Sequence, residues 1–95
     1  MNSTIQLKNI REVCKVFDLS EKCVGKVVEL RDKFIRNNNL SNCGITPKSF
    51  LAGLIYVSST LCREVRTQKQ IERGMSISTQ TLRKAKDKIV TELRL

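Results

Sequence analysis

The stretch RTQKQIERGMSISTQTLRKAKDKIVTEL, residues 66–93, decides the fold because it has the pattern of a short helix, a tight turn and a longer basic helix. Thr67 can cap the free amides of the first turn, and Gln70 stands three residues later, as in a capping box. Gly74 and the residues after it interrupt the helical period, and Ser78 is placed to cap the next helix. The pattern predicts a helix-turn-helix, a common device for placing side chains in a DNA groove.

The second helix of this stretch is amphipathic. On a helical wheel at about 100° per residue, one side carries the apolar residues Leu82, Ala85, Ile89, Val90 and Leu93. The opposite arc carries the polar residues Gln80, Arg83, Lys84, Asp87, Lys88 and Thr91. We expect the N-terminal part of this arc to meet DNA, because its residue types and its helix end are those that read base edges. An ordinary amphipathic helix with a solvated basic face would show the same pattern.

The charge of the chain favours a polyanionic partner. Its 95 residues include 18 Lys and Arg against nine Asp and Glu, which gives a net charge of +9 and a pI near 9.8. Nine basic and four acidic residues lie from Arg63 onward, so just over half of the excess belongs to the last third. Nucleic acid or an acidic protein surface would suit such a chain.

The cysteines do not form a metal-binding pattern. Cys14, Cys23, Cys43 and Cys62 include no CxxC pair, and the chain has no histidine, so the usual zinc-finger spacings are excluded and no metal or cofactor is expected. Two disulfides are the alternative, but no signal peptide precedes them, which favours reduced, buried thiols and an intracellular protein. No apolar run approaches the roughly 18 residues of a membrane span.

The rest of the chain predicts three further helices. Apolar residues at helical spacing indicate an amphipathic helix from Thr4 to Phe17 and a second from about Glu21 to Arg36, capped by Ser20. A loop from Leu40 to Thr46 follows. Thr46 and Pro47 are a strong helix start, because proline at the first position lacks an amide that would be unpaired anyway.

The third helix, from Pro47 to about Leu61, is apolar nearly all round and is therefore expected to be central. Ala52, Gly53, Ser58 and Ser59 are small enough to let other helices cross it closely. With five helices and no strand pattern, the sequence predicts an all-α fold in a single domain, residues 1–95, with the helix-turn-helix at 67–93.

The segment from residue 45 to residue 90 resembles the second cyclin-like repeat of archaeal transcription initiation factor B and eukaryotic general factor IIB. That repeat has a Ser/Thr-Pro helix start, a central L-Y-I-A-S, a basic R-T-Q and a turn that leads into T-I-R. The matching residues are Thr46-Pro47, Ile55-Tyr56-Val57-Ser58-Ser59, Arg66-Thr67-Gln68, Ile71, Ile77-Ser78 and Thr81-Leu82-Arg83. The first two helices fit the repeat more loosely.

The resemblance implies a five-helix cyclin-like fold whose last two helices enter the major groove beside a TATA box. It implies that Gln80 and Arg83 face bases. The residues expected near the DNA backbone are Arg66, Thr67, Gln68, Ser78, Thr79, Thr81, Lys84 and Lys88. The partners so implied are double-stranded DNA, the TATA-binding protein and the RNA polymerase assembly, in the cytoplasm and nucleoid of an archaeal-like cell or in a eukaryotic nucleus.

The chain departs from the family pattern in three places. Gln80 replaces the usual valine, so the base preference at that contact need not be the family's. Gly74, Met75 and Ser76 replace an apolar-Ala-Gly turn. The zinc ribbon, the reader loop and the first cyclin repeat of a complete factor are absent, so this chain alone is not expected to recruit polymerase.

Two functions remain open from the sequence. The first is promoter DNA binding in transcription initiation or its regulation, and the alternative is a cyclin-like protein-interaction module whose basic face is merely solvated. A dimeric helix-turn-helix repressor would need an additional apolar helix as an interface. No enzyme and no small-molecule substrate are expected, because histidine, a glycine-rich phosphate loop and clustered carboxylates are all missing.

Overall fold

The computed structural model describes residues 7–37 and 46–95. These residues form five helices and no strand: α1 Leu7–Val16, α2 Glu21–Asn37, α3 Pro47–Leu61, α4 Gln68–Met75 and α5 Thr79–Leu93. The predicted all-α, five-helix cyclin-like fold is confirmed. The predicted start at Thr4, the loop before Thr46 and Cys43 lie outside the described residues.

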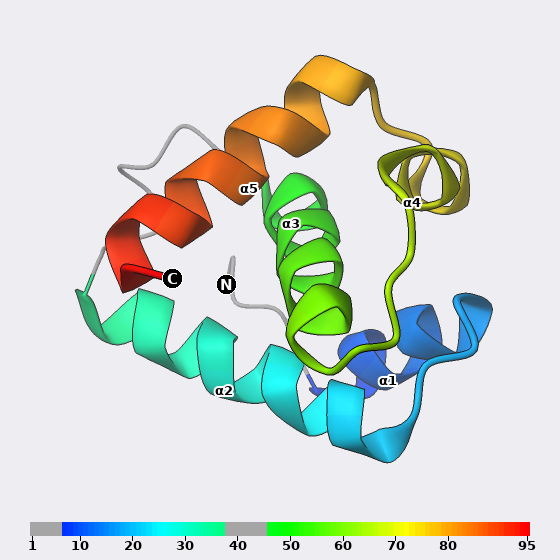
Figure 1. The fold of residues 1–95 in the computed structure, drawn as a ribbon, viewed down its shortest axis with the longest axis horizontal. Helices are drawn as coiled ribbons and strands as arrows, with labels where there is room; N and C mark the ends of the chain where they lie inside the picture. The colour runs from blue at the N-terminus through cyan, green and yellow to red at the C-terminus, as the bar shows by residue number, and fades with distance from the viewer. Residues whose placement is uncertain (1–6, 38–45) are drawn as a thin grey trace.

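Helix α3 is central, as its composition predicts, and the other helices surround it in Figure 1. Thr46 caps its start by accepting a 3.2 Å hydrogen bond from the Ser49 amide, and Pro47 follows at the first position. All the residues from Ser49 to Ile55 are buried, including Phe50 and Leu54 with no exposed surface. Burial on every side of the helix explains why its sequence lacks a polar stripe.

Helix α5 crosses α3 closely at Gly53. A Cβ atom added to Gly53 would lie 3.1 Å from the Ala85 Cβ and 2.9 Å from the Ile89 Cδ1. Both of these α5 residues are fully buried. The expectation that small residues let a helix cross α3 closely is confirmed at this position, and α3 therefore fixes where α5 lies.

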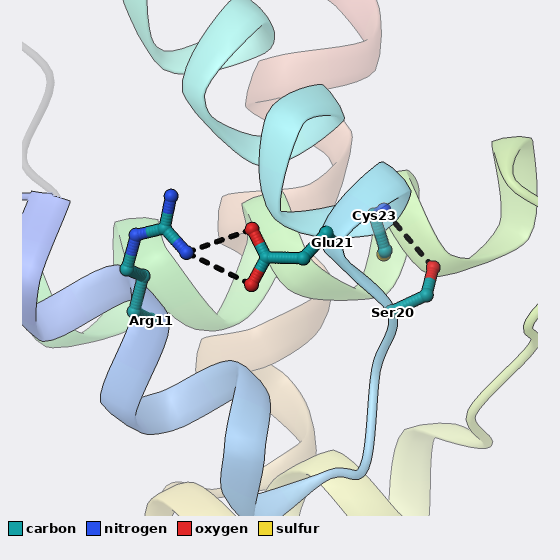
Figure 2. Close-up of polar contacts among 4 residues, drawn as sticks. All are labelled: Arg11, Ser20, Glu21 and Cys23. Carbon is teal, nitrogen blue, oxygen red and sulfur yellow. Dashed lines mark hydrogen bonds and ion pairs between the residues drawn. The ribbon is translucent and has the colours of Figure 1, made fainter.

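The connection between α1 and α2, which we call the corner, comprises residues 17–20. Asp18 adopts a left-handed conformation with φ 55°, and this ends the path of α1. Ser20 caps α2, where its Oγ accepts a 3.4 Å hydrogen bond from the Cys23 amide (Figure 2). Across the corner, Nη1 of Arg11 donates to both carboxylate oxygens of Glu21, at 2.7 and 2.8 Å (Figure 2). These contacts fix the angle between the two helices.

Three of the four cysteines lie in the described residues, and all three are buried free thiols. Burial raises the pKa of Cys14 to about 11. Burial, followed by the neighbouring Cys62, raises the pKa of Cys23 to about 12. These thiols are therefore neutral at physiological pH and react slowly with electrophiles.

We predict that replacing all four cysteines by alanine costs only packing energy, about 1 kcal/mol or less per buried site. The parent should label slowly with a thiol reagent at pH 8 and rapidly once unfolded. Folding raises the pKa values of Cys14 and Cys23 above the ordinary 9.0, so the folded state favours the neutral thiols. Their contribution to the free energy of unfolding is therefore complete below pH 9 and is lost as the pH rises toward 11–12. Stoichiometric zinc in the purified protein, or a mobility shift on reduction, would contradict this prediction.

Candidate nucleic-acid interface

Helix α4 begins with the predicted capping box. The Thr67 Oγ1 accepts a 3.1 Å hydrogen bond from the Gln70 amide, and the Gln70 Oε1 accepts a 2.8 Å bond from the Thr67 amide. Two amides that the helix itself leaves unpaired are thereby satisfied. The predicted helix start is confirmed at Thr67.

The turn between the two helices starts later than predicted. Helix α4 continues through Gly74 and Met75, and it ends at Ser76, which is left-handed with φ 56°. The turn expected near Gly74 to Ser78 is present but shorter, because the buried Met75 side chain keeps Gly74 and Met75 within α4. The turn is confined to the three residues from Ser76 to Ser78.

Gly74 is required by packing rather than by the turn. A Cβ atom at this position would lie 2.4 Å from Cζ of the Phe17 ring. Phe17 belongs to the corner, 57 residues earlier in the chain, and is itself 7% exposed. Glycine therefore lets the end of α4 rest against an aromatic ring, a contact that the local sequence does not reveal.

Helix α5 starts at a cap that also joins it to α4. The Ser78 Oγ accepts a 3.2 Å hydrogen bond from the Thr81 amide and donates a 2.8 Å bond to the Thr81 hydroxyl. Next to it, the Thr79 hydroxyl donates a 2.9 Å bond to the Glu72 carboxylate on α4. The Thr79–Glu72 bond links the two helices of the helix-turn-helix directly.

The division of α5 into two faces is confirmed. Leu82, Ala85 and Ile89 are fully buried, and Val90 and Leu93 pack half-buried against the edge of the core. On the other side, the exposed residues are Gln80, Arg83, Lys84, Asp87 and Thr91. Lys88 is half-buried instead and lies 3.8 Å from the Glu92 carboxylate.

We call Gln80, Arg83 and Lys84 the recognition face. Within residues 7–37 and 46–95, none of these side chains forms a hydrogen bond or an ion pair. Asp87, one turn further along, pairs at 3.1 Å with Lys86. The first two turns of α5 thus present two uncompensated cations and one amide to solvent.

The other predicted contact residues have different surroundings. Thr67, Ser78 and Thr79 are exposed, although each hydroxyl takes part in a cap or an interhelical bond. Thr81 and Gln68 are half-buried. A hydroxyl has one proton that it can donate to a phosphate oxygen. The Thr67 and Thr81 hydroxyls keep this proton, because their oxygens only accept, whereas Ser78 and Thr79 already donate theirs to Thr81 and Glu72.

Arg66 is occupied elsewhere. Its guanidinium donates to the carbonyls of Phe17 at 2.8 Å, Asp18 at 3.0 Å, Glu64 at 2.8 Å and Val65 at 3.3 Å. Four of the five guanidinium N–H groups are thus directed to backbone carbonyls. The structure therefore gives Arg66 a place in the fold, and the DNA-backbone contact that the resemblance implies stays a prediction.

Two further cations were missed by reasoning from the sequence. Lys69 and Arg73 are exposed on α4 and stand four residues apart, so they share one face of that helix. Neither forms an ion pair within the part of the chain that the structure describes. Their spacing on the first helix of the helix-turn-helix is the signal that could have identified them.

The surface around the recognition face does not enclose a ligand. A shallow depression of about 470 Å³ is lined by side chains of α5 alone, from Gln80 to Glu92. A shallow surface formed by one helix cannot surround a small substrate, and it is better suited to the groove of a larger molecule. Among the described residues, no group of three or more His, Cys, Asp or Glu side chains could hold a metal ion, and no helix is long and apolar enough to cross a membrane.

This arrangement defines a class of protein: a helical domain in which a helix-turn-helix is packed against a buried central helix. The sequence profile of the transcription factor TFIIB repeat matches residues 3–92. The chain belongs to this family, so the resemblance seen in the sequence is confirmed.

The chain is also similar to transcription initiation factor IIB 3 of Halobacterium salinarum. The two are 33% identical over 66 residues, which cover 70% of this chain and 20% of the relative. The chain therefore matches about a fifth of the length of that relative.

Proposed function

We propose that this chain binds double-stranded DNA in transcription initiation or its regulation, by placing the N-terminal half of α5 in the major groove. The observation that carries the proposal is the recognition face itself: three exposed, unpartnered side chains on a helix whose opposite face is buried against α3. Because the fold already orders the backbone of α5, little backbone freedom is lost when its first turns enter a groove.

The pattern of charge pairing supports this assignment. On α1 and α2, four of the described basic side chains have a carboxylate partner: Arg11 pairs with Glu21, Lys26 and Lys33 pair with Glu29, and Arg31 pairs with Asp32. On the helix-turn-helix, Arg83, Lys84, Lys69 and Arg73 have no carboxylate within the described residues. Phosphates of a duplex would compensate these charges and release counterions.

The residue types suggest a division of roles. Arg83 can bond both the O6 and the N7 of a guanine, and Gln80 can bond the N6 and the N7 of an adenine. Lys84 is suited to a phosphate, with Lys88 further along the same helix. The hydroxyls of Ser78, Thr79 and Thr81, together with Thr67 and Gln68 at the start of α4, border the groove as backbone contacts. The role is one of binding and involves no catalysis.

The larger assembly is part of the proposal. The name of the Halobacterium relative describes an initiation factor. We propose that this chain likewise acts beside the TATA-binding protein and the RNA polymerase assembly at a promoter. Its location would then be the nucleoid of an archaeal-like cell, or the nucleus if the cell is eukaryotic.

Lys84→Ala tests the phosphate role. This variant should weaken binding to every duplex alike and reduce the slope of log K against log salt by about one unit, because a phosphate contact releases counterions without reading sequence. The measurement is fluorescence anisotropy on selected and mixed-sequence duplexes between 50 and about 200 mM salt. Lys15→Ala is the matched control, because Lys15 is an exposed, unpaired lysine on α1.

An unchanged slope for Lys84→Ala would leave the alternative, a protein-interaction module. One observation favours that alternative: a groove of about 420 Å³ lies between α1, α3 and α4, with the apolar side chains of Val13, Leu51 and Met75 among those lining it. A partner helix would need such an apolar surface.

A further inference from the structure

The start of the helix-turn-helix is bonded to a part of the chain that is remote in sequence. Nε of Arg66 donates to the Phe17 carbonyl at 2.8 Å, and Nη2 donates to the Asp18 carbonyl at 3.0 Å. These carbonyls lie just past the end of α1, where the helix dipole favours a cation. Arg66 thus satisfies the end of α1 across 48 and 49 residues of sequence.

The same side chain also orders its own segment. Its Nη1 donates to the carbonyls of Glu64 and Val65, and its backbone amide donates to the buried Ser59 hydroxyl on α3 at 3.4 Å. Thr67, the cap of α4, is the next residue. The planar guanidinium donates to four carbonyls at once from its three nitrogens, which an ammonium group cannot do in the same geometry.

Glu64 makes a second bond to the corner from the same segment. Its carboxylate accepts from the Ser20 amide at 2.9 Å and also from the Ser20 hydroxyl, at the N-terminus of α2. The Ser20 hydroxyl and then its amide hold the pKa of Glu64 below its usual value, so this carboxylate is ionised at neutral pH. Arg66 and Glu64 therefore bond opposite sides of the corner.

The far end of α4 rests on the same corner. The Phe17 ring lies where a side chain on Gly74 would be. Phe17 therefore meets this segment at two points: its carbonyl accepts from Arg66, two residues before α4, and its ring lies against Gly74 near the end of α4. In contrast, α5 is placed by α3, through Gly53 and Ala85. Helix α4 also packs against α3, so the corner is a second support for α4 in addition to the central helix.

We propose that Arg66, supported by Glu64, is a positioning residue for DNA binding, which sets α4 against α5 by bonding the start of α4 to the corner. The inference rests on the proposed function, in which both helices meet the duplex. In this proposal Arg66 affects DNA binding by positioning α4, and not by contacting a phosphate. Loss of its fork of donors frees the start of α4 while leaving the placement of α5 intact.

Arg66→Lys is the sharpest test, because it keeps the charge and removes the fork. The expected results are about tenfold weaker binding to a duplex selected by the parent, an unchanged salt slope, and faster hydrogen exchange of the Ile71 amide with unchanged exchange at Ile89. Arg36→Lys is the matched control, because Arg36 is exposed in the last turn of α2 and has no part in the proposed interface, and it should be silent in all three measurements.

Glu64→Gln is a second, milder test of the same proposal, in which the electrostatic effect and the positioning effect on DNA affinity have opposite signs. The substitution removes one negative charge, so DNA binding should become tighter if Glu64 is only a surface acid. The positioning role predicts about threefold weaker binding and faster exchange in α4. If amide hydrogen exchange became faster by the same factor in α4 and in α5, Arg66 would stabilise the whole domain and not α4 in particular. That result would overturn the proposal.

The two proposals can fail separately. If Arg66→Lys binds and exchanges like the parent, the positioning role is wrong while DNA binding stands. If the parent itself binds no duplex, the proposed function fails, and the exchange of Ile71 against Ile89 still decides whether Arg66 holds α4.

Discussion

Leu54→Asp is expected to leave the domain unfolded at 25 °C. Leu54 is fully buried in the middle of α3, and the described core around it consists of apolar side chains and the hydroxyls of Ser58 and Ser59. A carboxylate there has no cation to pair with and must be buried charged or be neutralised, at a cost of several kcal/mol in addition to the lost packing. A domain of this size has only about 5–10 kcal/mol of stability to lose.

Thermal melting by circular dichroism measures this effect. Leu61→Asp is the matched control, because Leu61 is the last residue of the same helix and is 48% exposed. It should change the free energy of unfolding by about 0.5 kcal/mol, in the range of surface substitutions. A Leu54→Asp variant that melts like the parent would show that α3 is not the centre of the fold.

Gly53→Leu is expected to destabilise the domain by about 3 kcal/mol or more, since overpacking forces side chains and backbone apart. Even a Cβ atom would lie 3.2 Å from the carbonyl carbon of Ala85, which belongs to the α5 backbone and cannot rotate away. The larger side chain must push α5 off α3. Because α5 carries the recognition face, DNA affinity should fall along with stability.

Gly25→Ala separates this effect from the general preference of helices for alanine. Gly25 lies exposed in α2, and a Cβ atom there would meet nothing within 4 Å. That substitution should stabilise the domain by roughly 0.5–1 kcal/mol. Chemical denaturation of both variants measures the difference, and a Gly53→Leu variant as stable as the parent would refute the close crossing of α3 and α5.

The parts of the fold that depend on neighbouring residues could be predicted from the sequence. The caps at Thr46, Thr67 and Ser78 each bond an amide three residues later, so residue type and spacing suffice to identify them. The buried and exposed faces of α5 follow from a period of 3.6 residues. Periodicity also identified α3, since only a helix buried all round lacks a polar stripe.

The parts that depend on distant residues could not be predicted. Arg66 has the charge and position of a phosphate contact, and only the approach of the Phe17 and Asp18 carbonyls assigns it to the fold. Gly74 has the appearance of a turn residue, whereas the Phe17 ring explains it. In both cases the local sequence permits two uses, and a contact across about 50 residues selects one of them.

The claim that the recognition face reads DNA is tested most directly by one binding measurement. Fluorescence anisotropy should compare the parent, Arg83→Ala and Lys15→Ala on a duplex selected by the parent and on a mixed-sequence duplex of equal length. Both substitutions remove one exposed, unpaired positive charge, so diffuse electrostatics affects them equally. Gln80→Val, included as a further arm, should move the base preference, because an apolar contact with a thymine methyl replaces a pair with adenine.

If Arg83 bonds a guanine, Arg83→Ala should cost about 1–3 kcal/mol on the selected duplex, less on the mixed duplex, and relax discrimination at one base pair. Lys15→Ala should be nearly silent on both duplexes. Equal losses for Arg83→Ala and Lys15→Ala on the two duplexes would contradict groove reading by α5 and leave only a diffuse basic surface.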